Sequence, residues 1–318
     1  MSIIYKILSH HKTDIPLLIN KRSIQKESHR WNRIKWLTGK VCNIMLIIIC
    51  ILYISPLLIT ITNSFMRQEE IMRNYSTSGD IFHEEPQFVN IRLIPEIVSL
   101  QQYSTILIKT PTYLAAIWNS IAITLPVVAG QLIVSSMCAY SFCVLHFKGK
   151  EILFFTYIIV MLLPLQVTLM PNYIVADALN MANSYLAIIL PGIFHPFGVF
   201  VIRQYMESIP KSYLESAKMD GAGHLAIFTK IVLPNAKPGL AAAALLTFID
   251  YWNIIDQAVI FIQDSYRQPL SLFIAGINKQ QMGVSFAAST FYVLPVLIIL
   301  FYCQDYLKEG IQLSGIKG

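Results

Sequence analysis

The segment Ile209–Leu240 reads IPKSYLESAKMDGAGHLAIFTKIVLPNAKPGL and lies between two long apolar stretches. Ser212 and Glu215 have the S-x-x-E spacing of a capping box, in which a hydroxyl and a carboxylate bond the free amides at the start of a helix. This spacing predicts a short helix over 213–220. A structured helical element, and not a plain connection, is therefore expected between the two apolar stretches.

A second short helix is predicted directly after the first. Gly221 and Gly223 end the first helix, and apolar residues at helical spacing predict the second over 225–232, before Pro234 stops it. The apolar face of the second helix consists of Leu225, Phe228, Ile231 and Val232. Two short helices joined at glycine would form a compact knob that can dock on another protein.

Outside this segment, the sequence is dominated by apolar stretches that match the roughly 20 residues a helix needs to cross a bilayer. They fall at residues 41–64, 116–145, 151–171, 186–206, 239–261 and 287–305. Of all residues, 55% are hydrophobic and only 13% are charged, whereas soluble domains carry roughly 25% charged residues. The sequence therefore predicts an all-α, polytopic membrane protein with about six transmembrane helices.

The net charge of +6 could indicate nucleic-acid binding, so the placement of the basic residues decides its meaning. The tail 1–40 is strongly basic, whereas the segment 65–114 after the first span contains more acids than bases. By the positive-inside rule, the tail 1–40 and the loop 207–238 are cytoplasmic and the segment 65–114 is external. An even number of spans places the C-terminal tail 306–318 in the cytoplasm as well, and no nucleic-acid partner is expected.

The fourth apolar stretch contains residues that interrupt a helix, namely Pro191, Gly192, Pro196 and Gly198. In a membrane, the backbone groups freed by such an interruption must be satisfied by neighbouring helices or by a water-lined cavity. Both a broken helix that serves transport and a simple packed kink fit this pattern. His195 lies within it, and a lone histidine is more often a satisfied packing residue than a ligand.

Several residues of the loop match a known signature. Glu215, Ser216 and Ala217 are followed by Asp220 and Gly221, and then by Ile231, Leu233 and Pro234, in the spacing of the EAA signature of ABC importer permeases. The signature usually has alanine where this chain has Ser216, which exchanges one small residue for another. In this respect the chain resembles a permease subunit of a binding-protein-dependent ABC importer.

The resemblance extends over residues 41–318 and is strongest to the second permease type of carbohydrate importers of the maltose-like group. The stretches that support it are WNSIAIT at Trp118–Thr124, AYSF at Ala139–Phe142, LPLQVTLMPNY at Leu163–Tyr173, ILPGIFHPFGVFVIRQY at Ile189–Tyr205 and GIQLSGIKG at Gly310–Gly318. The basic tail 1–40 falls outside the resemblance.

The resemblance implies a function and a set of partners. The EAA residues would contact a cytoplasmic ATPase, and the chain would work with a second, different permease subunit, two ATPase subunits and an extracytoplasmic solute-binding protein. The chain has no GxxxxGK[ST] phosphate loop, so ATP and magnesium would bind the ATPase subunits and this chain would bind no cofactor. It would lie in the bacterial inner membrane and move a sugar or oligosaccharide by alternating access.

The fifth apolar stretch contains polar residues that suit a passing sugar, namely Asp250, Trp252, Asn253 and Asp256. Carboxylates inside a membrane are costly and usually face a cavity or a partner. Sugars offer hydroxyl groups to polar side chains and C–H faces to aromatic rings. The competing interpretation is that Asp250 and Asn253 form hydrogen bonds between helices while Trp252 fills an interface.

Other function classes are less well supported by the sequence. The chain has no HExxH or GxSxG motif and its histidines are scattered, so neither a metal site nor a catalytic centre is predicted. A stand-alone secondary transporter, which would couple to an ion through buried charges, and an importer permease for a solute other than a sugar remain as alternatives.

Overall fold

The computed structural model describes residues 21–75, 92–277 and 281–315, and every element in these ranges is a helix. Three parts of the expected regions lie outside these ranges, namely the start of the basic tail (1–20), residues 76–91 of the external segment and residues 316–318 of the C-terminal tail. The chain divides into two compact units, residues 1–58 and 59–318.

The first unit consists, in its described part, of most of helix α2 (Lys21–Ser64). The portion Thr38–Ser64 of α2 is long and apolar enough to span a membrane, with a mean hydropathy of 2.8. The first predicted span therefore lies in α2, which also extends back into the basic segment before residue 41.

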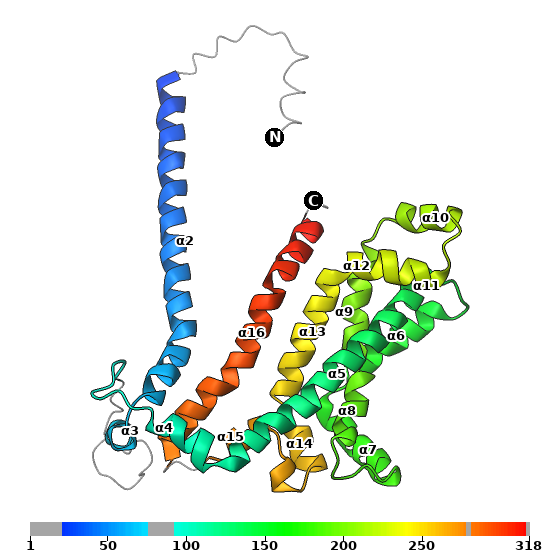
Figure 1. The fold of residues 1–318 in the computed structure, drawn as a ribbon. Coiled ribbons are helices and arrows are strands. Elements are labelled where there is room, and N and C mark those ends of the chain that lie inside the picture. The colour runs from blue at the N-terminus through cyan, green and yellow to red at the C-terminus, as the bar shows by residue number, and fades with distance from the viewer. Residues whose placement is uncertain (1–20, 76–91, 278–280, 316–318) are drawn as a thin grey trace. The chain divides into compact units, whose positions relative to one another are not determined.

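The second unit contains the other helices (Figure 1). In chain order these are α3 (Gln68–Tyr75), α4 (Gln101–Ser104), the π-helix η2 (Thr105–Lys109), α5 (Pro111–Val144), α6 (Lys150–Met161), α7 (Leu165–Ala178), α8 (Leu186–Ile193), α9 (Pro196–Glu207), α10 (Lys211–Met219), α11 (His224–Ile227), the π-helix η3 (Phe228–Val232), α12 (Leu233–Asn235), α13 (Lys237–Trp252), α14 (Asp256–Phe261), the 3₁₀-helix η4 (Ser265–Arg267), α15 (Leu270–Ala275) and α16 (Met282–Gly315).

Helix α5 is the centre of this unit, because it packs against α8, α9 and α13, and α13 in turn packs against α16. The approach of α8 to its neighbours requires a glycine at position 192. A Cβ added there would lie 2.6 Å from the Tyr251 hydroxyl oxygen and 2.8 Å from the Val127 Cγ1. The absence of a side chain at Gly192 thus allows α8 to lie close to both α5 and α13.

Four helical segments of the described chain are long and apolar enough to span a membrane alone, and the number rises to six if each of two bent helix pairs counts as one span. The predicted all-α, polytopic architecture is therefore confirmed. The single segments are Thr38–Ser64, Pro111–Val144, Leu186–Glu207 and Met282–Lys308.

The third predicted span, 151–171, is wrong as a single straight helix. It comprises α6 and the first half of α7, and these two helices meet at an angle of 101°. Pro164 lies directly before α7 with an extended ψ of 141°. A proline also disfavours the helical conformation in the residue that precedes it, so the chain turns at this point.

The fifth predicted span, 239–261, is also shorter than expected, because α13 ends at Trp252 and the chain becomes irregular before α14. The side-chain amide of Asn253 donates a hydrogen bond to the Ile249 carbonyl oxygen at 2.8 Å, alongside the Asn253 backbone amide at 3.1 Å. Asparagine side chains compete in this way with the helical backbone pattern, which favours a helix end here.

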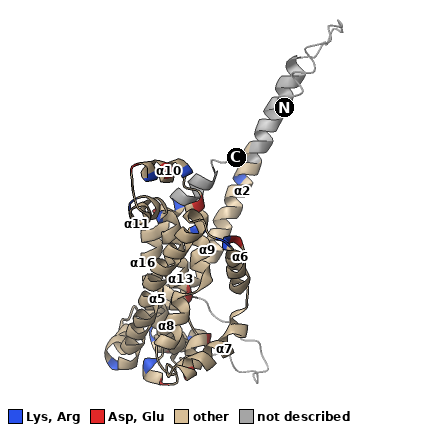
Figure 2. Cartoon of the chain, turned by 90° about the vertical axis from the view of Figure 1, so that its right-hand side faces the viewer, with Lys and Arg blue, Asp and Glu red and all other residues tan. Residues whose placement is uncertain are grey.

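Most charged residues of the second unit lie near the two ends of its helices (Figure 2). One end carries α10, α11 and the start of α6, and the other carries α7 and α14 (Figures 1 and 2). The helix portions between these ends are almost free of charge (Figure 2). Helices with uncharged middle portions and charged ends have the distribution of residues that a bilayer requires.

Candidate functional site

The helix formed by α8 and α9 is interrupted at Phe194 and His195, directly before Pro196. Proline has no backbone N–H, so the helical hydrogen-bond ladder cannot continue through it. The His195 carbonyl oxygen accepts a hydrogen bond from the Gln131 side-chain amide of α5, at 3.3 Å. The Gln131 side-chain oxygen accepts a bond from the Thr247 hydroxyl of α13. A neighbouring polar side chain thus satisfies a backbone group at the interruption.

A second interruption follows α13, over residues 253–255. The Trp252 carbonyl oxygen accepts a hydrogen bond from the Tyr292 hydroxyl at 3.1 Å. The Ile254 carbonyl oxygen accepts one from the Ser271 hydroxyl. Here too, side chains from other helices satisfy the backbone groups that the broken helix leaves free.

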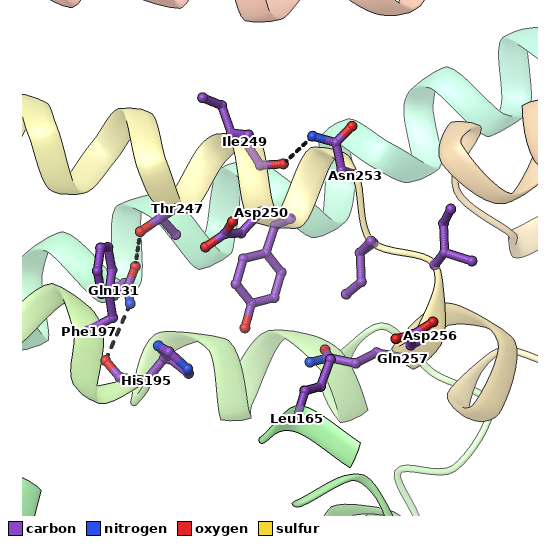
Figure 3. Close-up of a pocket in the computed structure, with 13 residues that line it drawn as sticks. Gln131, Leu165, His195, Phe197, Thr247, Ile249, Asp250, Asn253, Asp256 and Gln257 are labelled. Atoms are coloured by element: carbon purple, nitrogen blue, oxygen red, sulfur yellow. Dashed lines mark hydrogen bonds between the residues drawn. The ribbon is translucent and has the colours of Figure 1, made fainter. Parts of the chain in front are cut away.

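The two interruptions border the same cavity, which has a volume of about 510 Å³ (Figure 3). Its walls come from α5, α7, the α8–α9 interruption, α13 and the start of α14. The lining residues are Gln131, Leu165, His195, Phe197, Thr247, Ile249, Asp250, Tyr251, Asn253, Ile254, Ile255, Asp256 and Gln257. Irregular backbone in a membrane protein is tolerated where it lines a cavity or is buried in protein, and both interruptions line this cavity.

Three of the four residues predicted from the sequence to line a solute path lie on the wall of this cavity, namely Asp250, Asn253 and Asp256 (Figure 3). Their role in transport stays a prediction. Asn253 also accepts a hydrogen bond from the Tyr292 hydroxyl, so it has a packing contact as well.

Trp252 has a different position from the other three predicted residues. It is only 2% exposed and is not among the lining residues of the cavity. Its indole N–H donates to the Tyr292 carbonyl oxygen at 3.0 Å, and its ring stacks on Phe248 with 5.4 Å between the ring centroids. In this structure Trp252 fills a helix interface, as the competing interpretation expected.

Sequence reasoning missed several polar lining residues, including Gln131, Thr247 and Gln257. The signal that could have found the first two is a hydrogen-bonding side chain within an otherwise apolar span. His195, which the sequence favoured as a packing residue, is exposed and lines the cavity.

At the other end of the unit, the predicted helix pair is present with changed boundaries. The first helix is α10, and it begins at Lys211 directly after Pro210, without any side-chain cap. The predicted capping box is therefore wrong, because Ser212 already lies inside the first turn. Its carbonyl oxygen accepts a hydrogen bond from the Ser216 hydroxyl at 2.7 Å.

The second helix of the pair extends from His224 to Asn235 as α11, η3 and α12, and Pro234 does not end it. The π-helical turn η3 precedes Pro234, where the regular bonding pattern has to accommodate a residue without N–H. The helix instead ends at Asn235, and α13 begins two residues later at an angle of 73°.

The turn between the two helices depends on Gly221, whose φ of +76° lies in the left-handed region. Only glycine adopts this conformation without steric cost. The Gly221 amide donates to the Lys218 carbonyl oxygen and the Ala222 amide to the Ala217 carbonyl oxygen, at 3.0 and 2.9 Å. These bonds satisfy carbonyl groups at the end of α10.

The helix pair rests on the transmembrane helices through Tyr140 of α5. Its hydroxyl group is 3.1 Å from the His224 Nδ1 and donates to the His224 carbonyl oxygen at 3.2 Å. Its ring also contacts the Phe228 ring, with 5.1 Å between the centroids. Ala217 and Ile227 belong to the same buried cluster of apolar side chains. The base of the helix pair is therefore firmly attached to α5.

The outer surface of the helix pair is unusually apolar for an exposed segment. Tyr213, Met219 and Leu225 are 54%, 88% and 75% exposed, respectively. Among the predicted coupling residues, Glu215, Ser216, Asp220, Gly221 and Pro234 are exposed, Ile231 and Leu233 are half-buried, and Ala217 is buried. The structure contains no partner chain, so their contact with an ATPase stays a prediction.

Comparison with known proteins places this architecture in a known group. The family described as "Binding-protein-dependent transport system inner membrane component" matches residues 131–312. The chain is 29% identical to the arabinooligosaccharides transport system permease protein AraQ of Bacillus subtilis over 273 residues, which is 84% of this chain and 92% of that protein. It is 30% identical to the AraQ protein of Halalkalibacterium halodurans, covering 85% of this chain and 93% of that protein.

The fold also resembles a solved structure. A bacterial ABC transporter involved in the import of the acidic polysaccharide alginate contains a chain that superimposes with a TM-score of 0.71 and 22% sequence identity. The superposition covers 86% of this chain and 98% of that one. At this level of identity, the likeness supports the fold.

Proposed function

Because this chain belongs to the family of binding-protein-dependent transport system inner membrane components, we propose that it is one permease subunit of an ATP-driven importer that carries a sugar or oligosaccharide. The chain is a multi-pass membrane protein and a transporter subunit, not an enzyme. The saccharide transport named for its relatives supports the solute class.

The observation that supports this function most is the cavity between the two interrupted helices. Its wall offers amide, hydroxyl and carboxylate groups from Gln131, Thr247, Asp250 and Asn253. These groups can exchange hydrogen bonds with sugar hydroxyls, and the neighbouring Tyr251 ring can contact a C–H face of a sugar. The walls come from several helices, so relative movement of these helices would open or close the cavity.

The α10–α12 helix pair is the part suited to receive mechanical force from an ATPase. Its exposed apolar residues Tyr213, Met219 and Leu225 offer a docking surface, and the Tyr140–His224 contact attaches its base to α5. We expect two cytoplasmic ATPase subunits, which would bind ATP and magnesium, to hold this knob and that of a second permease subunit.

The transport cycle would then be alternating access. An extracytoplasmic binding protein delivers the solute, closure of the ATPase subunits turns the cavity outward, and hydrolysis returns it to the inward state. Differential contacts of the knob with the closed and open ATPase dimers would shift the equilibrium between the two states.

The distribution of basic residues supports the orientation. Lys150 and Lys211 lie at the same end of the unit, where they line a small cavity together with Arg203. Loops rich in Lys and Arg remain on the cytoplasmic side. We therefore place the α10 end, and both chain termini, in the cytoplasm of a bacterium whose inner membrane holds the complex.

Co-purification of the assembled complex tests this function. Gly221→Val requires a β-branched residue at φ +76°, which costs roughly 1–2 kcal/mol or more. Gly221→Asn is the matched control, because asparagine tolerates this conformation. The tagged wild-type chain is expected to recover a second permease and an ATPase, with about five- to thirtyfold less ATPase for Gly221→Val and little change for Gly221→Asn. Recovery of the wild-type chain alone, still transporting, would contradict the proposal.

A further inference from the structure

The cavity wall has a distinct charge. Among the described residues that line it, Asp250 and Asp256 are acidic and none is Lys or Arg. His195 is the only basic side chain in this set. The complete chain, in contrast, has a net charge of +6. An acidic cavity in a basic protein is therefore a local property of this site.

Within the described part of the chain, neither carboxylate forms an ion pair, and the basic group that interacts electrostatically with Asp250 is His195 of the same wall. The ion pairs of the described residues involve other acids. Both side chains are exposed and border the cavity. A solute in the cavity therefore meets two carboxylates that no described Lys or Arg pairs with.

Charge on the wall of a cavity between helices has a large effect on a bound solute, because Coulomb energies rise as the effective dielectric constant falls below that of water. A carboxylate also only accepts hydrogen bonds, and a sugar hydroxyl can donate them. A second carboxylate on the solute would instead repel the wall and leave acceptor facing acceptor. The wall is complementary to a polyhydroxylated solute without negative charge.

We propose that Asp250 and Asp256 make this subunit selective for uncharged saccharides over saccharides that carry a carboxylate. This inference rests on the proposed transport function and specifies its substrate class. Asp250 and Asp256 are specificity-determining residues in this view, because they act on the solute directly.

The test uses the complete transporter and its binding protein in proteoliposomes. The first probe is a neutral oligosaccharide bound by the binding protein, and the second is the same oligosaccharide with one primary hydroxyl oxidised to a carboxylate. Potassium and valinomycin clamp the membrane potential, so that uptake of the charged probe is not limited by charge build-up. Uptake is measured at saturation with the loaded binding protein, for the wild type, Asp250→Asn, Asp256→Asn and the double variant.

The measured quantity is the uptake rate of the carboxylated probe divided by that of the neutral probe. Comparing this ratio between variants cancels any preference of the binding protein, which is the same in all samples. We expect the double variant to raise the ratio about tenfold, equal to about 1.4 kcal/mol, and each single variant to raise it less. Asp177→Asn is the matched control, because Asp177 is an exposed carboxylate of α7 that does not line the cavity.

The possible outcomes distinguish a failure of the proposed selectivity from a failure of the proposed transport function. An unchanged ratio in the double variant, with intact uptake of the neutral probe, would overturn the selectivity and leave the transport function standing. A wild-type complex that hydrolyses ATP but takes up no saccharide would overturn the transport function itself. If the asparagine variants do not assemble, the selectivity is tested in the wild type with the same oligosaccharide carrying an amino group in place of the carboxylate. Uptake no faster than that of the carboxylated probe would overturn the selectivity.

Discussion

The hydrogen bonds of Gln131 give the most direct test of how the interrupted helices are held. Gln131 is 3% exposed and connects three helices, because it donates to the His195 carbonyl oxygen of the α8–α9 interruption and accepts from the Thr247 hydroxyl of α13. Gln131→Leu removes both bonds while retaining a side chain of comparable volume. It leaves the His195 carbonyl oxygen and the Thr247 hydroxyl group without the partner that Gln131 provides.

The expected loss follows from the value of such bonds. Hydrogen bonds between membrane helices contribute about 0.6 kcal/mol on average and up to about 1.7 kcal/mol. Two of them give a predicted loss of about 1–3 kcal/mol in the free energy of unfolding for Gln131→Leu. Thr247→Val removes only the hydrogen bond between Thr247 and Gln131, so it should lower the free energy of unfolding by about half as much.

The assay is unfolding of the purified complex in detergent, by heat or by denaturing detergent. In a double-mutant cycle, Thr247→Val should cost less in the Gln131→Leu background, because the bond between Thr247 and Gln131 is already absent. Ser141→Ala is the control, since the Ser141 hydroxyl bonds only the Met137 carbonyl oxygen within α5. Equal stability of Gln131→Leu and Ser141→Ala, or strictly additive losses for Gln131 and Thr247, would refute this account.

Two further predictions concern the ends of the unit. Tyr140→Phe removes the hydroxyl contact to His224 but keeps the aromatic ring. We therefore expect ATP hydrolysis to continue while the amount of solute taken up per ATP falls several-fold. An unchanged ratio of uptake to hydrolysis would mean that this contact does not transmit movement. The Arg73 side chain, through its hydrogen bond and charge, and then Arg92, lower the pKa of Glu96 from its usual 4.5. A carboxyl group with a depressed pKa stabilises the folded state above its unfolded pKa, and this contribution is lost as the pH falls through its folded pKa. The Arg73–Glu96 contact should therefore weaken below pH 4.5 and be lost as the pH falls through the lowered pKa of Glu96, measured as a smaller hydrogen-exchange protection factor near residue 96. Glu96→Gln should abolish that pH dependence, and its persistence in this variant would exclude Glu96 as the cause.

Much of the candidate site could be predicted from residue type. Asp250, Asn253 and Asp256 are polar residues in or beside a membrane helix, where polar side chains are costly and therefore conspicuous. Trp252 was grouped with them by proximity in sequence. In a helix, two residues correspond to a rotation of roughly 200°, so the Trp252 side chain lies on a different face from that of Asp250 and packs between helices.

Gln131, His195 and Thr247 could not be combined into one site from the sequence. More than fifty residues separate each from the next along the chain, and each has an ordinary packing interpretation when taken alone. Only the packing of α5 against α8, α9 and α13 brings them to one cavity.

The sequence by itself determined the helical, membrane-spanning character of this protein and the position of the α10–α12 helix pair, because both depend on local composition and spacing. The tertiary structure decided where the helices are interrupted. Prolines 56, 126, 171, 191 and 295 lie inside helices, so the predicted interruption at Pro191 is absent, whereas Pro164 and Pro196 lie where one helix ends and the next begins. A proline frees backbone groups wherever it occurs, but the outcome depends on whether a neighbour such as Gln131 can satisfy them, and that neighbour is supplied by the fold.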